Sequence, residues 1–138
     1  MIRPLRRTLI AEDTFDWQKF HTINLKSYHG YQMDFYLGAN AREALKIAQE
    51  QIHDPFDLII TDLQMEEDFL PDYAGEWLIK ELRMFKEYKN TPIIIVSGAY
   101  NIASVAQSLG CDYISKRTLT IYPHKYEEML SKYYYKNY

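Results

Sequence analysis

The sequence predicts an α/β protein built on a mostly parallel sheet. Short β-branched runs alternate with longer stretches of helical spacing, and this alternation is typical of repeated βα units. Three of the strand candidates are nearly continuous apolar runs, which indicates strands covered by helices on both faces. The length of 138 residues fits one domain with one core, so we expect a single unit over residues 1–138.

Five strands are predicted, followed in most cases by a helix. The strands are expected at 8–11, 33–37, 58–61, 93–97 and 113–115. Apolar residues at helical spacing predict helices around 44–52, 78–85, 102–109 and 126–133. The first helix, at 15–28, has a weaker pattern because Asn24 and Ser27 interrupt its apolar face, and Gly30 is expected to end it.

Composition and charge exclude several classes of protein. The longest aliphatic run is four residues, at 93–96, far below the roughly 18 apolar residues of a membrane helix. A net charge of -3 gives no overall electrostatic signal for nucleic acid. Residues 1–7 are basic, with Arg3, Arg6 and Arg7, and we interpret this segment as a solvated leader. The lone cysteine, Cys111, is compatible with a reducing cytoplasm.

Polar residues stand where the predicted strands end. Glu12 and Asp13 follow the first strand, Asp62 the third, Ser97 ends the fourth and Lys116 follows the fifth. Ligands bind outside the carboxyl ends of parallel strands, so these side chains are expected to meet at one edge. Neighbouring carboxylates call for a hard divalent cation such as Mg²⁺, and a carboxylate, a hydroxyl and an ammonium together suit phosphoryl transfer.

At these positions the chain resembles the receiver domains of bacterial response regulators, over nearly its whole length. Glu12 and Asp13 match the acidic pair of the family and Asp62 its phosphoacceptor. Ser97 and Lys116 match the switch hydroxyl and the lysine, and Tyr113 matches the aromatic switch position. The resemblance implies a flavodoxin-like, doubly wound sheet of five parallel strands in the order 2-1-3-4-5, with helices on both faces.

The resemblance also implies a function. Asp62 would accept a phosphoryl group from a histidine kinase or a phosphotransfer protein, with Mg²⁺ held by Asp13, Asp62 and the backbone carbonyl of Gln64, and with Glu12 assisting through water. Ser97 and Tyr113 would then change conformation. Such a protein is a switch that catalyses only its own phosphorylation and dephosphorylation. Its output would be a downstream protein or a second copy, bound by the fourth helix, fifth strand and fifth helix, with no nucleic acid or membrane partner.

Other interpretations remain open for single residues and for the whole chain. Taken alone, Asp13 and Asp62 would be helix caps, Ser97 a turn residue, Lys116 a surface charge and Tyr113 a core residue. The main alternative is a pseudo-receiver, a protein-interaction module of the same fold that takes no phosphate. An aspartate-nucleophile phosphatase is disfavoured because Gln64 stands where its second acid would be, and a flavin-binding protein because the acids after the first strand would repel phosphate.

The chain departs from the family at two places. Arg117 follows Lys116, where the family usually has proline. From Asp62 to Gly75 there are 75 - 62 = 13 positions, which indicates an insertion of about five residues at 66–70. Glu66, Glu67 and Asp68 are expected near the rim of the site, either tuning phosphate lifetime and kinase choice or simply solvated.

Overall fold

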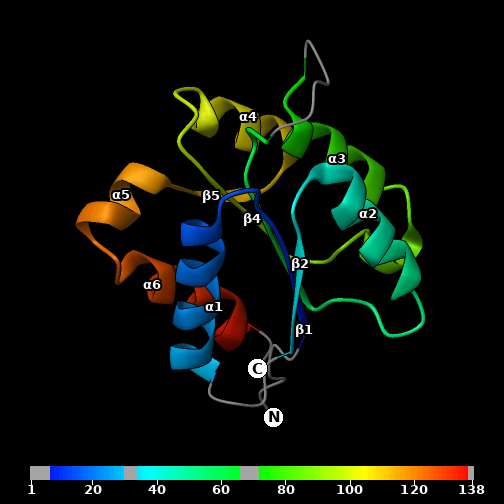
Figure 1. Cartoon of the computed structure of the whole chain (residues 1–138), viewed down its shortest axis with the longest axis horizontal. Helices are drawn as coiled ribbons and strands as arrows, with labels where there is room; N and C mark the ends of the chain where they lie inside the picture. The colour runs from blue at the N-terminus through cyan, green and yellow to red at the C-terminus, as the bar shows by residue number, and fades with distance from the viewer. Residues whose placement is uncertain (1–6, 30–33, 66–71, 137–138) are drawn as a thin grey trace.

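The computed structural model describes residues 7–29, 34–65 and 72–136. Five parallel strands form one sheet in the order β2-β1-β3-β4-β5, which confirms the predicted topology (Figure 1). The strands are β1 (Arg7–Ala11), β2 (Asp34–Gly38), β3 (Leu58–Thr61), β4 (Ile93–Ser97) and β5 (Asp112–Ser115). Ala11 pairs with Thr61, so the ends of β1 and β3 are in register at one edge of the sheet.

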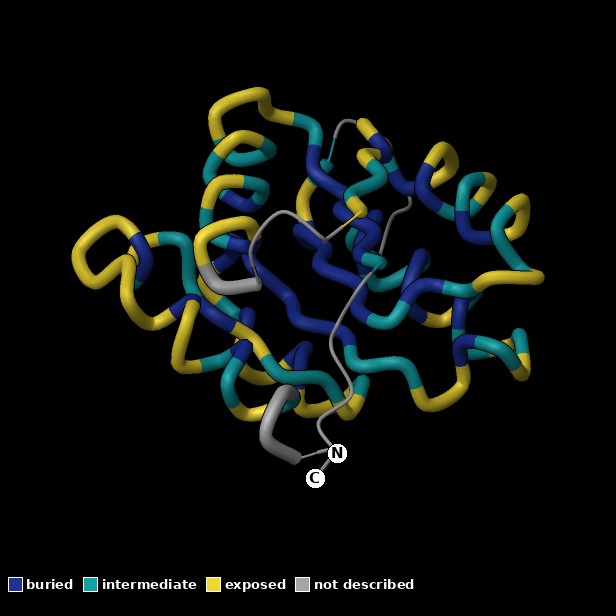
Figure 2. Tube along the Cα trace, turned by 90° about the horizontal axis from the view of Figure 1, so that it is seen from below, coloured by how far each residue is buried: buried dark blue, intermediate teal, exposed yellow. Residues whose placement is uncertain are grey.

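Helices cover both faces of this sheet. One face carries α2 (Ala41–Glu50), α3 (Ala74–Leu82) and α4 (Ile102–Leu109); the other carries α1 (Phe15–His29), α5 (Lys116–Ile121) and α6 (Lys125–Lys136). Alternate residues of the buried strands face the two sides, so that Ile59 packs beneath α2 and α3, and Ile60 beneath α1 and α6. Figure 2 shows the buried strands running through the middle of the molecule with exposed helix surfaces around them.

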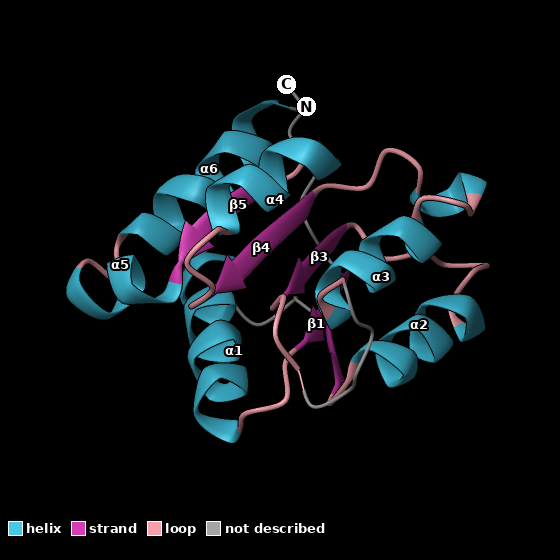
Figure 3. Ribbon diagram, turned by 90° about the horizontal axis from the view of Figure 1, so that it is seen from above, coloured by secondary structure: helices cyan, strands magenta, loops and turns pink. Residues whose placement is uncertain are grey.

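The helix after β5 differs from the prediction. Ser115 caps a short helix, α5, by accepting a hydrogen bond at Oγ from the Arg117 N–H (3.2 Å). A proline at position 117 could not donate this bond, so the departure from the family pattern has a structural use here. The chain leaves α5 through Tyr122 and Pro123, and the helix expected at 126–133 follows as α6 (Figure 3).

Other boundaries lie close to the predicted ones. The strands begin or end within one residue of expectation where they are described, and α4 ends at Gly110 in the left-handed region (φ 68°), a position that favours glycine. The third helix lies earlier in the chain than predicted: α3 begins at Ala74 and ends at Leu82, and Phe85 instead precedes a 3-10 turn, η2 (Lys86–Tyr88). Gly30, expected to end α1, lies outside the described residues.

The prediction of a solvated leader is wrong at its last residue. Arg7 is the first residue of β1, and its side chain is only 11 % exposed. The guanidinium lies over the rings of Tyr36 and Phe56, 5.2 and 5.3 Å from their centroids, and Nη2 donates to Gln51 Oε1 (2.6 Å). Residues 1–6 lie outside the described part of the chain. No helix among the described residues is long and apolar enough to span a membrane.

Candidate functional site

Glu12 is held immediately after β1 by its backbone and its carboxylate. Its N–H donates to the Gly38 carbonyl (3.1 Å), which continues the pairing of β1 with β2. One carboxylate oxygen, Oε2, accepts from the N–H (3.1 Å) and the hydroxyl (3.3 Å) of Thr14, and Gln18 Nε2 donates to the Glu12 carbonyl (2.7 Å). Glu12 is 1 % exposed, so its charge lies inside the protein.

Asp62 follows β3 and is 5 % exposed. Its N–H donates to the Ala11 carbonyl (3.0 Å), which places it beside the end of β1. Its Oδ1 accepts hydrogen bonds from the N–H groups of Leu63 (2.7 Å) and Gln64 (3.2 Å), and Oδ2 accepts from Lys116 Nζ (2.7 Å). Both oxygens are therefore oriented, one by the backbone and the other by an ammonium group.

Gly75 packs directly against the backbone of Asp62. A Cβ atom built at position 75 would lie 2.1 Å from the Asp62 carbonyl oxygen and 2.8 Å from Leu63 Cα, distances that real contacts do not allow. The Gly75 N–H donates to the Leu63 carbonyl (3.0 Å). The first turn of α3 thus supports the chain at Asp62, and only glycine fits there.

Lys116, the first residue of α5, lies between the two acids. Its Nζ is 2.7 Å from Glu12 Oε1 and 2.7 Å from Asp62 Oδ2, and it lies over the Trp17 ring, 4.9 Å from the centroid. Burial by itself lowers the pKa of Lys116, but its hydrogen bond to Asp62 and its contact with Glu12 outweigh this, so the pKa lies above its ordinary value. The group is an ammonium at neutral pH.

Three carboxylates form a cluster that could hold a metal ion. Glu12, Asp13 and Asp62 each offer an oxygen within 4.8 Å of the others. Burial raises the pKa of Glu12, and the contact with Lys116 offsets only part of the rise. Its Oε1 contacts Lys116 as an ion pair but has no aligned hydrogen bond among the described residues. An acidic, all-oxygen cluster with an incompletely satisfied buried carboxylate fits a hard divalent cation such as Mg²⁺.

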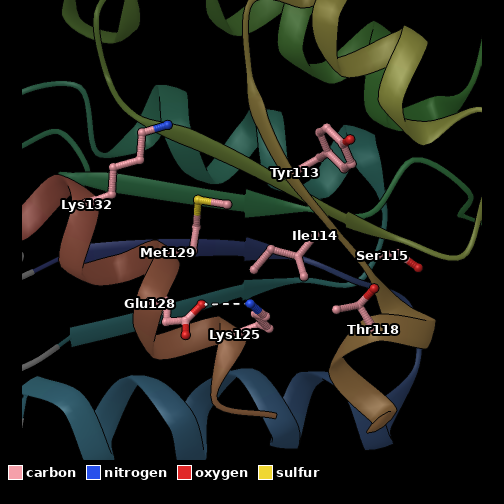
Figure 4. Close-up of a pocket in the computed structure, with 8 residues that line it drawn as sticks. All are labelled: Tyr113, Ile114, Ser115, Thr118, Lys125, Glu128, Met129 and Lys132. Carbon is pink, nitrogen blue, oxygen red and sulfur yellow. Dashed lines mark ion pairs between the residues drawn. The ribbon is translucent and has the colours of Figure 1, made fainter. Parts of the chain in front are cut away.

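The two predicted switch residues occupy contrasting environments. Ser97 is fully buried at the end of β4, where its Oγ accepts a hydrogen bond from the Ala99 N–H (3.2 Å). Tyr113 is 41 % exposed on β5. It lines a groove of about 380 Å³ between β5 and α6, opposite Lys125, Glu128 and Lys132 (Figure 4).

The structure thus brings Glu12, Asp13, Asp62 and Lys116 together at the carboxyl edge of the sheet. The predicted loop residues Glu66 to Leu70 lie outside the described residues. Sequence reasoning missed Thr14 and Gln18, which position Glu12, and it missed the contact of Trp17 with Lys116. Their proximity in sequence to the acidic pair was the available signal.

Comparison with known proteins agrees with this architecture. No protein-family model matches the chain, and no curated protein matches it. Solved structures do match. The chemotaxis protein CheY4 of Vibrio cholerae is 22% identical, with a TM-score of 0.72 over 94% of this chain and 98% of that one. The receiver domain of the histidine kinase CKI1 from Arabidopsis thaliana is 26% identical, with a TM-score of 0.65 over 90% of this chain and 92% of that one.

A third similar structure is a complex. In it the receiver domain of the Saccharomyces cerevisiae response regulator Ssk1 is bound to the histidine phosphotransfer protein Ypd1. That receiver domain is 21% identical to this chain, with a TM-score of 0.71 over 97% of this chain and 92% of its own length. The protein therefore has the fold of the receiver domains of two-component signalling proteins.

Proposed function

We propose that this protein is a phosphoacceptor receiver in a two-component phosphorelay, and that Asp62 carries the phosphoryl group. The observation that carries the proposal is the contact of Lys116 Nζ with Asp62 Oδ2 (2.7 Å), beside two further carboxylates at the carboxyl edge of the sheet. A buried nucleophile, a fixed ammonium and a cation-binding cluster are the parts that phosphoryl transfer requires.

In the reaction, a carboxylate oxygen of Asp62 forms a bond to phosphorus as the phosphorus–nitrogen bond of a phosphohistidine breaks. The electron pair of the broken bond stays on the departing imidazole. Lys116 balances charge on the phosphoryl oxygens because its pKa keeps it protonated at neutral pH. Asp13, Asp62 and the backbone carbonyl of Gln64 would hold Mg²⁺, with Glu12 acting through water. When bound, the ion neutralises charge on the transferring group.

The phosphodonor we propose is a histidine kinase or a histidine phosphotransfer protein. A structurally similar receiver, that of Ssk1, is bound to such a phosphotransfer protein in its solved structure, which supports this class of partner. Charge does not favour nucleic acid, because the chain carries a net charge of -3. The single free thiol, Cys111, is compatible with a cytoplasmic location.

The signal would leave through a population shift between two packings of Ser97 and Tyr113. Ser97 would turn its hydroxyl toward the phosphoryl group, and the exposed ring of Tyr113 would move inward. The surface formed by α4, β5 and α6 would then change. A downstream protein, or a second copy of this chain, that binds one arrangement better would read the state of Asp62.

The test is to incubate the protein with acetyl phosphate and Mg²⁺ and to measure its intact mass. We expect the wild-type chain to gain one phosphoryl group and Asp62→Asn to gain none. Asp16→Asn is the matched control, because Asp16 is an exposed aspartate in the first turn of α1 and should leave the gain unchanged. A wild-type protein that takes no phosphoryl group would favour the pseudo-receiver. If Asp62→Asn is still phosphorylated at the wild-type rate, the phosphoacceptor is a residue other than Asp62.

A further inference from the structure

Among the described residues, the Lys116 ammonium also contacts an aromatic side chain. Besides Glu12 and Asp62, each 2.7 Å away, it has the face of the Trp17 indole, whose centroid lies 4.9 Å from Nζ. An ammonium group over the face of an indole is attracted by the negative potential of the ring, and the attraction grows when water is excluded. The Lys116 side chain is 16% exposed, so most of the surrounding water is excluded.

The indole is itself held in place by packing. Trp17 lies edge-on to Phe20, with ring centroids 5.1 Å apart, and it packs against the core cluster beneath α1 and α6. Trp17 and Phe20 also line a hollow of about 300 Å³ together with Leu119 of α5 and Pro123. The ring is therefore a fixed surface beside a side chain that has four rotatable bonds of its own.

The three neighbours of Lys116 would respond differently to the loaded site. A divalent cation and a phosphoryl group would compete for the oxygens of Glu12 and Asp62, because both carboxylates belong to the cluster that fits the cation. The indole carries no ligand for a hard cation, so its attraction for the ammonium would persist. In phosphoryl transfer this matters because a misplacement of about 1 Å can slow a reaction by about 100-fold.

We propose that Trp17 is a positioning residue for Lys116, and that its ring keeps the ammonium directed at the phosphoryl group when cation and phosphate engage the carboxylates. The proposal rests on the proposed function, because it assigns Trp17 a part in phosphorylation of Asp62. Trp17 touches neither the phosphoryl group nor the cation. It acts through Lys116 alone.

The test compares Trp17→Leu with Trp17→Phe. Leucine keeps an apolar side chain but has no aromatic face, whereas phenylalanine keeps a weaker one. With acetyl phosphate and saturating Mg²⁺, we expect Trp17→Leu to phosphorylate about tenfold more slowly and Trp17→Phe to recover most of the rate. Trp77→Leu is the matched control: Trp77 lies under Arg42 in a similar pair (5.2 Å) between α2 and α3, so the loss of this second indole should leave the rate within twofold.

A double-mutant cycle tests whether the effect passes through Lys116. In a Lys116→Ala background, which should itself be slow, Trp17→Leu should cause no further loss. Equal losses in the two backgrounds would overturn the proposal, and so would a wild-type rate in Trp17→Leu. If Trp17→Phe is as slow as Trp17→Leu, the aromatic face is not what matters and the proposal also fails.

A spectroscopic measurement separates failure of this inference from failure of the proposed function. Trp17 and Trp77 are the two tryptophans of the chain, so Trp77→Phe leaves Trp17 as the sole indole emitter. Lys116→Met in that protein should change the emission spectrum, because the charge over the ring is removed. If the wild-type chain takes no phosphoryl group but the emission still changes, the pairing stands and the phosphoacceptor function fails. An unchanged spectrum would refute the pairing itself.

Discussion

At the scale of single residues, His21 and Tyr126 form a buried polar pair. His21 Nδ1 lies 2.8 Å from the Tyr126 hydroxyl, between α1 and α6, and both side chains are almost completely buried. Burial, together with the charge of Lys116, lowers the pKa of His21 to about 3. The ring is therefore neutral in the folded protein at neutral pH, and the pair joins α1 to α6 by a hydrogen bond.

This pair predicts an acid dependence of stability. The unfolded chain binds a proton at His21 below about pH 6.5, whereas the folded chain does not do so until about pH 3. The contribution of the neutral His21 ring to the free energy of unfolding is therefore complete above pH 6.5. It is lost as the pH falls from 6.5 toward 3, by up to about 1.4 kcal/mol per pH unit. Urea unfolding of the wild-type chain and of His21→Leu/Tyr126→Phe between pH 5 and 7 should show a steeper slope in the wild type.

The single substitution Tyr126→Phe provides the control for that experiment. It keeps His21 and so should keep the acid slope, while leaving one buried nitrogen without its partner at a cost of about 1–3 kcal/mol. The double variant replaces both polar groups by apolar ones and should lose less stability at pH 7. Identical slopes in wild type and double variant would show that His21 does not titrate between these states.

Residues differ in how far their contacts could be predicted from the sequence. Asp62 and Lys116 were predictable because they follow strands whose ends must meet, so position along the chain implied position in space. Arg7 was not, since its partners Gln51 and Phe56 are more than 40 positions away and only the sheet register brings them together. Trp17 belongs to the same group: its spacing indicates packing, and its contact with Lys116 depends on the direction in which α5 leaves the sheet.

At the scale of elements, α3 is the support for Asp62. The contact depends on Gly75, where an added methyl group would lie 2.1 Å from the Asp62 carbonyl oxygen. Relief of this clash requires the first turn of α3 or the chain at Asp62 to move. Gly75 makes this contact although it stands thirteen positions after Asp62 in the sequence.

We therefore predict that Gly75→Ala is destabilising and slows phosphorylation. Overpacking at a rigid backbone contact costs about 1–3 kcal/mol or more, and the shift would disturb the two N–H groups that orient Asp62 Oδ1. Urea unfolding and the rate of mass gain with acetyl phosphate measure the two effects. Gly98→Ala is the control for stability, because a Cβ there meets nothing within 4 Å. Equal stability of Gly75→Ala and wild type would contradict the contact.

The helix α5 could not be predicted from the sequence pattern. It has six residues, of which only Leu119 is buried, so it shows too little periodicity to be recognised. Its existence depends on a cap by Ser115 and on the break at Pro123. The longer helices were predictable because each buries a stripe of apolar side chains along one face, as α2 does with Ala41, Ala44 and Ala48.

At the scale of the whole molecule, the strand order places three carboxylates at one edge before any ligand is bound. Because like charges within about 4 Å repel by roughly 4 kcal/mol near a surface, the acidic cluster opposes folding unless a cation is present. Lys116 supplies one positive charge to the cluster. A divalent ion would supply more, and its binding energy would add to the stability of the fold.

We predict that Mg²⁺ stabilises the wild-type protein, by about 2.7 kcal/mol at a concentration 100 times its Kd. Asp13→Asn should remove most of this gain and should itself be slightly more stable than wild type in EDTA, because one repulsion is lost. Urea unfolding with Mg²⁺ and with EDTA gives both quantities. If Asp13→Asn gains as much stability from Mg²⁺ as the wild type, Asp13 does not hold the ion.

We predict that phosphorylation of Asp62 changes the groove between β5 and α6. Tyr113 is 41 % exposed and shares this groove with Ile114 and Met129, while the rim carries the Lys125–Glu128 ion pair (3.2 Å; Figure 4). Inward movement of the ring would expose apolar floor and change the shape of the groove. A binding partner that prefers one arrangement by about 1.4 kcal/mol would shift tenfold in affinity.

Phosphorylation with acetyl phosphate and Mg²⁺ should therefore change amide hydrogen exchange in β5 and α6, and it should change self-association if the partner is a second copy. Tyr113→Ala should still be phosphorylated on Asp62 but should lose the change in exchange, because the ring that transmits it is gone. Tyr100→Ala removes a tyrosine that is 96 % exposed and does not line this groove, so it should respond as wild type does. If phosphorylation does not change hydrogen exchange in β5 and α6, Tyr113 does not transmit the state of Asp62 to this surface. The same conclusion follows if the change is equally large in Tyr113→Ala.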